Sequence, residues 1–208
     1  MNEMLRIRGL QKNFGARRVL AVESFAAAAG ECALIFGDNG CGKTTLLKIL
    51  AGLMRPDAVA EWRFDGRECR PSGRGAAGAV LLHQTPFMFA AATRANVAVA
   101  ARDRGRIDSA LRWAGLSRVA GAPARGLSGG EKARVSLARA RAAEMKLCLM
   151  DEPAAHLDAA GLELAADLVA DLRRRGAATI IAAPSRTDAI PYDRAWRLEN
   201  DGRLTENV

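Results

Sequence analysis

One nine-residue run, GDNGCGKTT at 37–45, restricts the folds open to this chain more than any other feature. It fits the pattern G-x-x-x-x-G-K-[ST] at every fixed position. The apolar residues 33–36 precede it and are typical of a buried strand. The helix predicted after it has an apolar side formed by Leu46, Leu47, Ile49, Leu50 and Leu53. A strand, a glycine-rich loop and a helix in this order predict the opening of an α/β unit and argue against a chance glycine-rich turn.

Glycine-rich loops of this pattern bind phosphate groups. Glycine permits tight turns whose N–H groups point at phosphate oxygens, and the helix N-terminus adds its positive dipole. We expect Lys43 to supply charge for the β- and γ-phosphates and Thr44 to supply a hydroxyl ligand for Mg²⁺. The predicted nucleotide-binding residues here are Gly37, Asp38, Asn39, Gly40, Cys41, Gly42, Lys43, Thr44 and Thr45. The loop alone does not distinguish kinases, GTPases and motor ATPases.

Two carboxylates, Asp151 and Glu152, follow a second apolar run at 147–150. Strand ends in α/β sheets face the ligand crevice, so both side chains are expected near the phosphate loop. Asp151 is a candidate Mg²⁺ ligand acting through water, and Glu152 is a candidate general base for the attacking water. Acidic residues before Pro153 are also typical of a helix N-cap. The phosphate loop elsewhere in the chain favours the catalytic interpretation.

A second anion site is predicted at Ser128, Gly129 and Gly130. Ser is a good N-cap, and two glycines expose backbone N–H groups at the start of the predicted helix 131–144. A single nucleotide cannot easily use two such sites placed far apart on one chain. The simplest expectation is that this site contacts ATP held by a second copy of the protein.

With LSGGE at 127–131, the sequence resembles the ATP-binding-cassette (ABC) family, whose signature is LSGGE or LSGGQ. The resemblance extends over essentially the whole chain, and the motifs stand in family order. GDNGCGKTT matches the Walker A motif, LCLMDEP matches Walker B, and 155–158 matches the D-loop. The resemblance implies an ATPase that works as a head-to-tail dimer around ATP and Mg²⁺.

Two further site residues are implied by the resemblance. Phe14 matches the aromatic residue that stacks on adenine, although an aromatic residue beside a Gly15 turn could equally belong to the core. Gln84 matches the Q-loop residue, which senses Mg²⁺ and the attacking water and contacts the membrane subunits.

One position departs from the family pattern. The family carries a switch His after the strand that follows the D-loop helix, and Ser185 stands at that place. The last His of the chain is His156, so no alignment register supplies one. A Ser hydroxyl can donate one hydrogen bond to the γ-phosphate but has no protonatable ring. Arg186 or a water is the alternative group for that role.

The predicted fold class is α/β: a P-loop NTPase cassette with a RecA-like core, a small antiparallel β lobe and a helical subdomain. The predicted single domain spans 1–208, with the core and β lobe at 1–83 and 146–208 and the helical signature subdomain at 84–145. Alternating residues predict strands near Leu5 and Ile7 and a hairpin from Trp62 across Asp65-Gly66.

The net charge and the distribution of apolar residues indicate whether the chain binds nucleic acid or enters a membrane. The net charge of +8 is spread as single arginines, which favours a solvated basic surface over a nucleic-acid site. Residues 1–12 are too polar for a signal peptide, and the most apolar stretch, 76–101, is interrupted by polar residues. We therefore expect a cytoplasmic protein, and the family resemblance implies that permease subunits hold it peripherally on the inner face of the membrane.

Three functional classes compete: the ATPase of a transporter, a soluble cassette protein of DNA repair or translation, and a weakly hydrolysing regulator. Only about 80 residues separate the phosphate loop from the signature, too few for the coiled coil of repair cassettes. Translation-type members carry two cassettes, and this sequence contains one. These features favour the transporter.

The region Gln84 to Phe89 resembles the Q-loop region of oxyanion importers. A tungstate-type importer, served by an extracytoplasmic substrate-binding protein, is the leading interpretation because no C-terminal regulatory domain is expected. The ATPase of an exporter remains the alternative.

Overall fold

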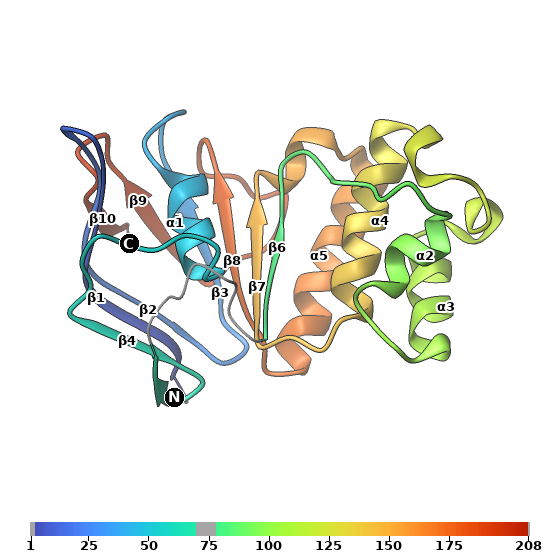
Figure 1. The fold of residues 1–208 in the computed structure, drawn as a ribbon, viewed down its shortest axis with the longest axis horizontal. Coiled ribbons are helices and arrows are strands. Elements are labelled where there is room, and N and C mark those ends of the chain that lie inside the picture. Colours follow the sequence, from blue (N-terminus) through green and yellow to red (C-terminus); the bar gives the residue numbers. More distant parts are fainter. Residues whose placement is uncertain (1–2, 70–77, 208) are drawn as a thin grey trace.

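The computed structural model describes residues 3–69 and 78–207 (Figure 1). Layers of secondary structure lie side by side: an antiparallel sheet, a helix, a mainly parallel sheet and two layers of helices. The antiparallel sheet has the order β2-β1-β4-β5, and the larger sheet has the order β10-β9-β3-β8-β7-β6. The strands are β1 (Glu3–Phe14), β2 (Arg17–Ala28), β3 (Cys32–Phe36), β4 (Glu61–Phe64), β5 (Arg67–Glu68), β6 (Ala79–Leu82), β7 (Leu147–Asp151), β8 (Ala178–Ala183), β9 (Arg194–Leu198) and β10 (Leu204–Asn207). The helices are α1 (Lys43–Leu50), α2 (Thr93–Ala98), α3 (Arg104–Trp113), α4 (Gly129–Ala142) and α5 (Ala159–Arg174).

The parallel strands β3, β8 and β7 are apolar on both faces because each face is covered. On β3, Ala33 and Ile35 join the core around α1, whereas Cys32 and Leu34 join the core under α5. Strand β7 alternates in the same way, so the sheet separates two hydrophobic cores. The parallel pairing of β3 and β7 with β8 brings their carboxyl ends to the same edge.

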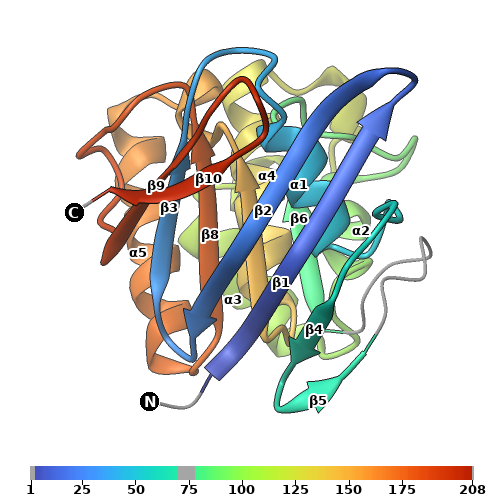
Figure 2. The ribbon, with the colours of Figure 1, turned by 90° about the vertical axis from the view of Figure 1, so that its left-hand side faces the viewer.

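Helix α1 lies between the two sheets (Figures 1 and 2). Its Leu46, Leu47, Ile49 and Leu50 are buried with residues of β1, β2 and the parallel sheet. The long ribbon of β1 and β2 therefore curves over the helix that begins at the phosphate loop. This arrangement places the turn between β1 and β2 at the mouth of the phosphate-loop region.

The helices α2, α3 and α4 come between β6 and β7 in the chain and share a third core with Val97, Leu111 and Val135. A hydrogen bond and a salt bridge connect this layer to α5. Trp113 donates from its Nε1 to Asp167 at 2.6 Å, and the Arg141 guanidinium lies 3.4 Å from the same carboxylate.

The predicted fold class is confirmed, including the antiparallel lobe, the α/β core and the helical layer. The helix expected at 131–144 spans Gly129–Ala142, and it begins two residues earlier because Ser128 caps it. Strand β6 was not predicted, and helix α2 was predicted only as part of the helical subdomain at 84–145: both lie in the apolar stretch 76–101, where polar residues mask the periodicity. The subdomain limits at 84 and 145 stay a prediction. Among the described residues, no helix combines the length and apolar character needed to cross a bilayer.

Candidate functional site

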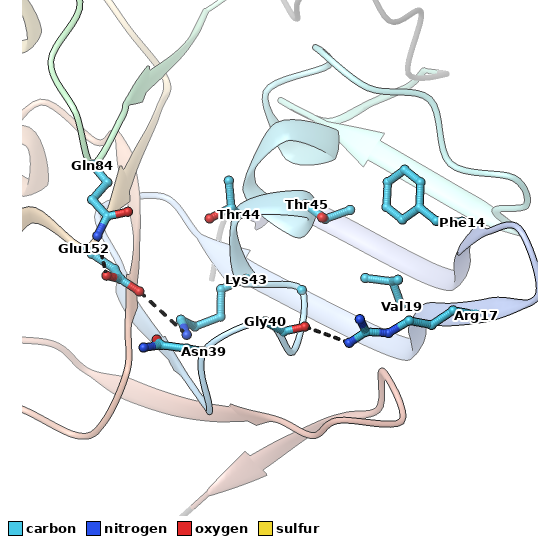
Figure 3. Close-up of a pocket in the computed structure, with 11 residues that line it drawn as sticks. Phe14, Arg17, Val19, Asn39, Gly40, Lys43, Thr44, Thr45, Gln84 and Glu152 are labelled. Atoms are coloured by element: carbon cyan, nitrogen blue, oxygen red, sulfur yellow. Dashed lines mark hydrogen bonds and ion pairs between the residues drawn. The ribbon is translucent and has the colours of Figure 1, made fainter.

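A pocket of about 460 Å³ lies over the carboxyl edge of the parallel sheet, at the N-terminus of α1 (Figure 3). It collects residues from the β1–β2 ribbon, the phosphate loop, the segment after β6 and the end of β7. Its walls are formed by Phe14, Arg17, Val19, Asn39, Gly40, Gly42, Lys43, Thr44, Thr45, Gln84 and Glu152. The structure thus brings the predicted phosphate loop, Q-loop residue and general base into one cavity.

The phosphate loop is packed closely against its surroundings. A Cβ on Gly37 would lie 2.2 Å from the Leu198 carbonyl oxygen, and one on Gly42 would lie 2.9 Å from a Val19 methyl group. Gly42 also has φ 115°, which disfavours other residues. Both positions therefore require glycine for the loop to reach its conformation.

Lys43 is 5% exposed, and its Nζ donates to the carbonyl oxygens of Gly37 and Asp38 at 2.7 and 3.1 Å. The same Nζ lies 3.7 Å from a carboxylate oxygen of Glu152. A buried ammonium with this placement offers a positive charge at the floor of the pocket. The geometry suits the phosphate role predicted for Lys43.

Two other residues of the loop, Asp38 and Cys41, do not line the pocket. Cys41 is 1% exposed and packs in the core, and burial raises the pKa of its thiol. The Asp38 carboxylate accepts a hydrogen bond from Asn200 at 3.1 Å instead of facing the pocket. These two residues can contact a phosphate only through their backbone N–H groups.

The donor set of a magnesium site is present beside the loop. The Thr44 hydroxyl donates to Asp151 Oδ2 at 2.8 Å. Asp151 is 4% exposed, and its Oδ1 is buried without a hydrogen-bond partner among the described residues. A buried, unsatisfied carboxylate oxygen next to a hydroxyl fits Mg²⁺, which prefers oxygen ligands and retains several waters. The residues present therefore fit the predicted ion.

Glu152 has a left-handed backbone conformation, with φ 48° and ψ 54°. A non-glycine residue in this region costs of order 1 kcal/mol, and such conformations cluster at functional sites. Its N–H donates to the Ala182 carbonyl at 2.9 Å, which ties the turn to β8. Its Oε2 accepts from Gln84 Nε2 at 2.9 Å, so the carboxylate joins Gln84 and Lys43 across the pocket (Figure 3).

Phe14 lies at the opposite end of the pocket from Glu152 (Figure 3). Its side chain is 50% exposed, so the alternative that it belongs to the core is wrong. An exposed ring at the rim of a polar pocket provides a flat apolar surface. Arg17 and Val19, which share the ribbon with Phe14, also line the pocket and were not predicted from the sequence.

Ser128 caps α4 as predicted, in a capping box with Glu131. Glu131 accepts from the Ser128 N–H at 2.9 Å and from its hydroxyl at 2.8 Å, and these bonds lower the pKa of the Glu131 carboxyl. Gly129 and Gly130 have open space where a Cβ would lie. None of these residues lines the pocket of the same chain, so the two predicted anion sites lie apart.

The signature helix is connected to the D-loop within the chain. Arg134 of α4 donates to both carboxylate oxygens of Asp158, at 3.0 and 3.1 Å. Asp158 caps α5 by accepting from the Gly161 N–H at 2.8 Å, and this bond, followed by Arg134, lowers its pKa. The exposed glycines of α4 and the D-loop are thereby fixed relative to each other.

Ser185 lies two residues beyond the end of β8 and is exposed. It does not line the pocket at the N-terminus of α1; it lines a neighbouring cavity of about 280 Å³ that also touches Glu152. The alternative group Arg186 donates to the Tyr192 hydroxyl at 3.3 Å and to Asn207 at 3.5 Å, away from Glu152. Ser185 is thus nearer the expected position than Arg186.

Comparisons with known proteins point to one family. The family model described as "ABC transporter" matches residues 20–155. The Fe(3+) ions import ATP-binding protein FbpC 1 of Rhodococcus jostii is 35% identical over 218 residues, which cover 99% of this chain and 62% of that protein. The cytochrome c biogenesis ATP-binding export protein CcmA of Rhodospirillum rubrum is 36% identical over 173 residues, covering 81% of this chain and 74% of that protein.

Among solved structures, cbiO1 from Clostridium perfringens, part of the ABC transporter complex cbiONQ, superposes with a TM-score of 0.81 at 26% identity. That match covers 98% of this chain and 87% of cbiO1. The chain spans about three fifths of the length of the iron-import relative, at 62%.

Proposed function

The chain belongs to the ABC transporter family, and from this premise we propose that it binds ATP with Mg²⁺ and hydrolyses it to power transport across a membrane. The observation that carries the proposal is the meeting of Lys43, Gln84 and Glu152 in one pocket, beside the hydroxyl of Thr44 and the unsatisfied oxygen of Asp151. Phosphate release from ATP, measured with and without Mg²⁺, tests it. Release that needs Mg²⁺ is expected, and no release under any condition would contradict the proposal.

Each side chain has a defined part in the reaction. Lys43 and the loop N–H groups stabilise negative charge on the β- and γ-phosphates. Thr44 and Asp151 would hold Mg²⁺, which neutralises phosphate charge when bound. Glu152 accepts the proton of the attacking water, and Gln84, bonded to Glu152 at 2.9 Å, orients the carboxylate and the water. Phe14 provides the surface on which adenine stacks.

We further propose that the working unit is a head-to-tail dimer. The exposed N-terminus of α4, with Ser128, Gly129 and Gly130, would contact the γ-phosphate of ATP held by the partner copy. The capping box supports this assignment, because it fixes the orientation of the exposed N–H groups without using Gly129 or Gly130. The helical subdomain proposed at 84–145 carries this site.

Replacing Ser128 with Arg should abolish hydrolysis by the homodimer, because the long side chain fills the exposed cap and obstructs the partner's ATP. Mixing this variant with Lys43→Ala chains should restore activity in heterodimers. Each heterodimer then has at most one intact composite site, which combines Lys43 of one chain with Ser128 of the other. Phosphate release is the readout, and Arg125→Ala, at an exposed residue before the signature, is the control. Full activity of Ser128→Arg alone would show that the second anion site is not used.

The proposed partners are membrane-spanning permease subunits, with an extracytoplasmic substrate-binding protein if the system imports. The chain would then lie at the cytoplasmic side of the membrane, peripherally attached; nucleic acid is not a proposed partner. Exposed Phe87 and Phe89, which follow Gln84, support a protein contact at this loop.

For the cargo we propose a small oxyanion of the tungstate kind, on the resemblance of the region from Gln84 to Phe89 to oxyanion importers. The relatives named above include both an import protein and an export protein, so export is the alternative direction. Uptake of tungstate by cells with and without this chain tests the cargo. Equal uptake in the two strains would contradict it.

A weakly hydrolysing regulator is the second candidate, favoured by Ser185 at the switch position. We expect slow hydrolysis by the wild type and faster hydrolysis by Ser185→His. One well-placed donor at such a site is worth roughly 3–4 kcal/mol, and the Ser hydroxyl recovers part of this, so the gain should be below about a thousandfold. Steady-state rates of wild type, Ser185→Ala and Ser185→His decide the matter. If Ser185→Ala equals wild type and Ser185→His gains nothing, Ser185 has no part in catalysis.

A further inference from the structure

The β1–β2 ribbon presents one face of its turn to the nucleotide pocket. Phe14 and Arg17 are direct partners in the antiparallel register, so their side chains lie on the same face of the ribbon. Val19, at the register irregularity that follows Arg18, lines the pocket together with Phe14 and Arg17. Arg18 and its register partner Asn13 alternate to the opposite face. The strand pairing therefore selects Arg17, and not Arg18, as a pocket residue.

The Arg17 guanidinium reaches the outer side of the phosphate loop. Its Nη2 donates to the Gly40 carbonyl at 3.0 Å (Figure 3). A guanidinium has five N–H donors, and within 3–69 and 78–207 the Gly40 carbonyl is the one hydrogen-bond partner recorded for this side chain. Over the same residues, no carboxylate lies within ion-pair distance of Arg17. Its positive charge thus faces the pocket without a neutralising group.

The position of Arg17 along the pocket defines which part of a nucleotide it can reach. Gln84 and Glu152 lie at one end, Lys43 lies in the middle, and Arg17 and Phe14 lie at the other end (Figure 3). With the γ-phosphate near Glu152 and adenine on Phe14, the α-phosphate and ribose pass between Lys43 and Phe14. A planar guanidinium there can pair with phosphate oxygens in a bidentate manner.

We propose that Arg17 is a further nucleotide-binding residue, which pairs with the α-phosphate of ATP or ADP. This inference rests on the proposed function of the same pocket and extends it beyond the phosphate loop. The competing explanation is that Arg17 only braces the loop through Gly40. If Arg17 only braces the loop, its loss should weaken the binding of every ligand of the loop equally. If Arg17 contacts the α-phosphate, its loss should not weaken the binding of pyrophosphate held by Lys43.

The test compares two ligands that the protein does not need to hydrolyse. Binding of MgADP and of magnesium pyrophosphate is measured by calorimetry for wild type, Arg17→Ala, Arg17→Lys and the control Arg18→Ala. Arg17→Ala should weaken MgADP about tenfold, the effect of losing one charge-assisted contact at an exposed site. Pyrophosphate affinity should be unchanged, Arg17→Lys should be intermediate, and Arg18→Ala should match wild type. Arg17 is exposed, so the thermal unfolding midpoint without ligand should not move.

Two outcomes would overturn the inference while leaving the proposed function intact: unchanged MgADP affinity in Arg17→Ala, or equal losses for MgADP and pyrophosphate. Wild-type protein that binds neither ligand would overturn the proposed function, and this inference with it.

Discussion

Replacing Lys43 with Ala should reduce ATP affinity by about a hundredfold or more and abolish measurable turnover. The ammonium is buried and lies at the floor of the pocket, where its attraction to phosphate is weakly screened. Losing a charged partner of a phosphate removes charge-assisted hydrogen bonds worth about 1.5–3 kcal/mol each. Loss of one hydrogen-bond donor to the transition state lowers the rate by a further factor of about a hundred to a thousand. Calorimetry and phosphate release measure the two effects separately.

The matched control is Lys48→Ala, on the same helix α1 but outside the pocket. It removes an equal charge, so it corrects for any general electrostatic effect on nucleotide binding. Thermal unfolding without nucleotide detects whether Lys43→Ala disturbs the loop, whose Gly37 and Asp38 carbonyls lose their donor. ATP affinity and turnover equal to wild type in Lys43→Ala would contradict the assignment of the pocket.

Replacing Glu152 with Gln should lower turnover by about a hundred- to ten-thousandfold, the usual contribution of a general base, while ATP binding survives. Gln has nearly the same shape and can still accept the hydrogen bond that Gln84 Nε2 donates at 2.9 Å. The left-handed backbone of Glu152 should be retained, because its N–H remains bonded to the Ala182 carbonyl. The change therefore removes a proton acceptor and leaves the geometry of the pocket in place.

The control for this variant is Glu163→Gln, an exposed residue of α5. It makes the same chemical change away from the pocket and should hydrolyse ATP at the wild-type rate. If Glu152→Gln also kept the wild-type rate, the base would have to be another residue, and the interpretation of the strained turn at Glu152 would fail.

The sequence predicted the centre of the site well because local chemistry determines it. The glycines of 37–45, the apolar strands before the loop and before Asp151, and the capping residues of α4 act over a few residues. Parallel pairing with β8 then brings Lys43 near Glu152, as the general rule for strand ends in α/β sheets led us to expect. The pairs of Thr44 with Asp151 and of Gln84 with Glu152 follow from that arrangement.

Features that depend on tertiary contacts were not predictable. Arg17 was included in the solvated basic surface expected from the sequence, and only the register of β1 with β2 shows that it shares a face with Phe14. Strand β6 has weak periodicity, and its pairing with β7 decides its conformation. The position of Ser185 after β8 was predictable from the sequence, but its place in a cavity beside Glu152 was not. For β6 and Ser185 the deciding contact joins residues far apart in the chain, whereas for Arg17 it is the register of a hairpin.

The claim that two copies share ATP is tested most directly by the mass of Glu152→Gln in solution, measured by light scattering with MgATP, with MgADP and without nucleotide. The account predicts a dimer with MgATP and a monomer in the other two conditions, since the γ-phosphate joins the two chains and hydrolysis is blocked. Adding Ser128→Arg to this variant should restore the monomer in MgATP. A monomer with saturating MgATP at high protein concentration, or a dimer that Ser128→Arg does not disturb, would contradict the shared site.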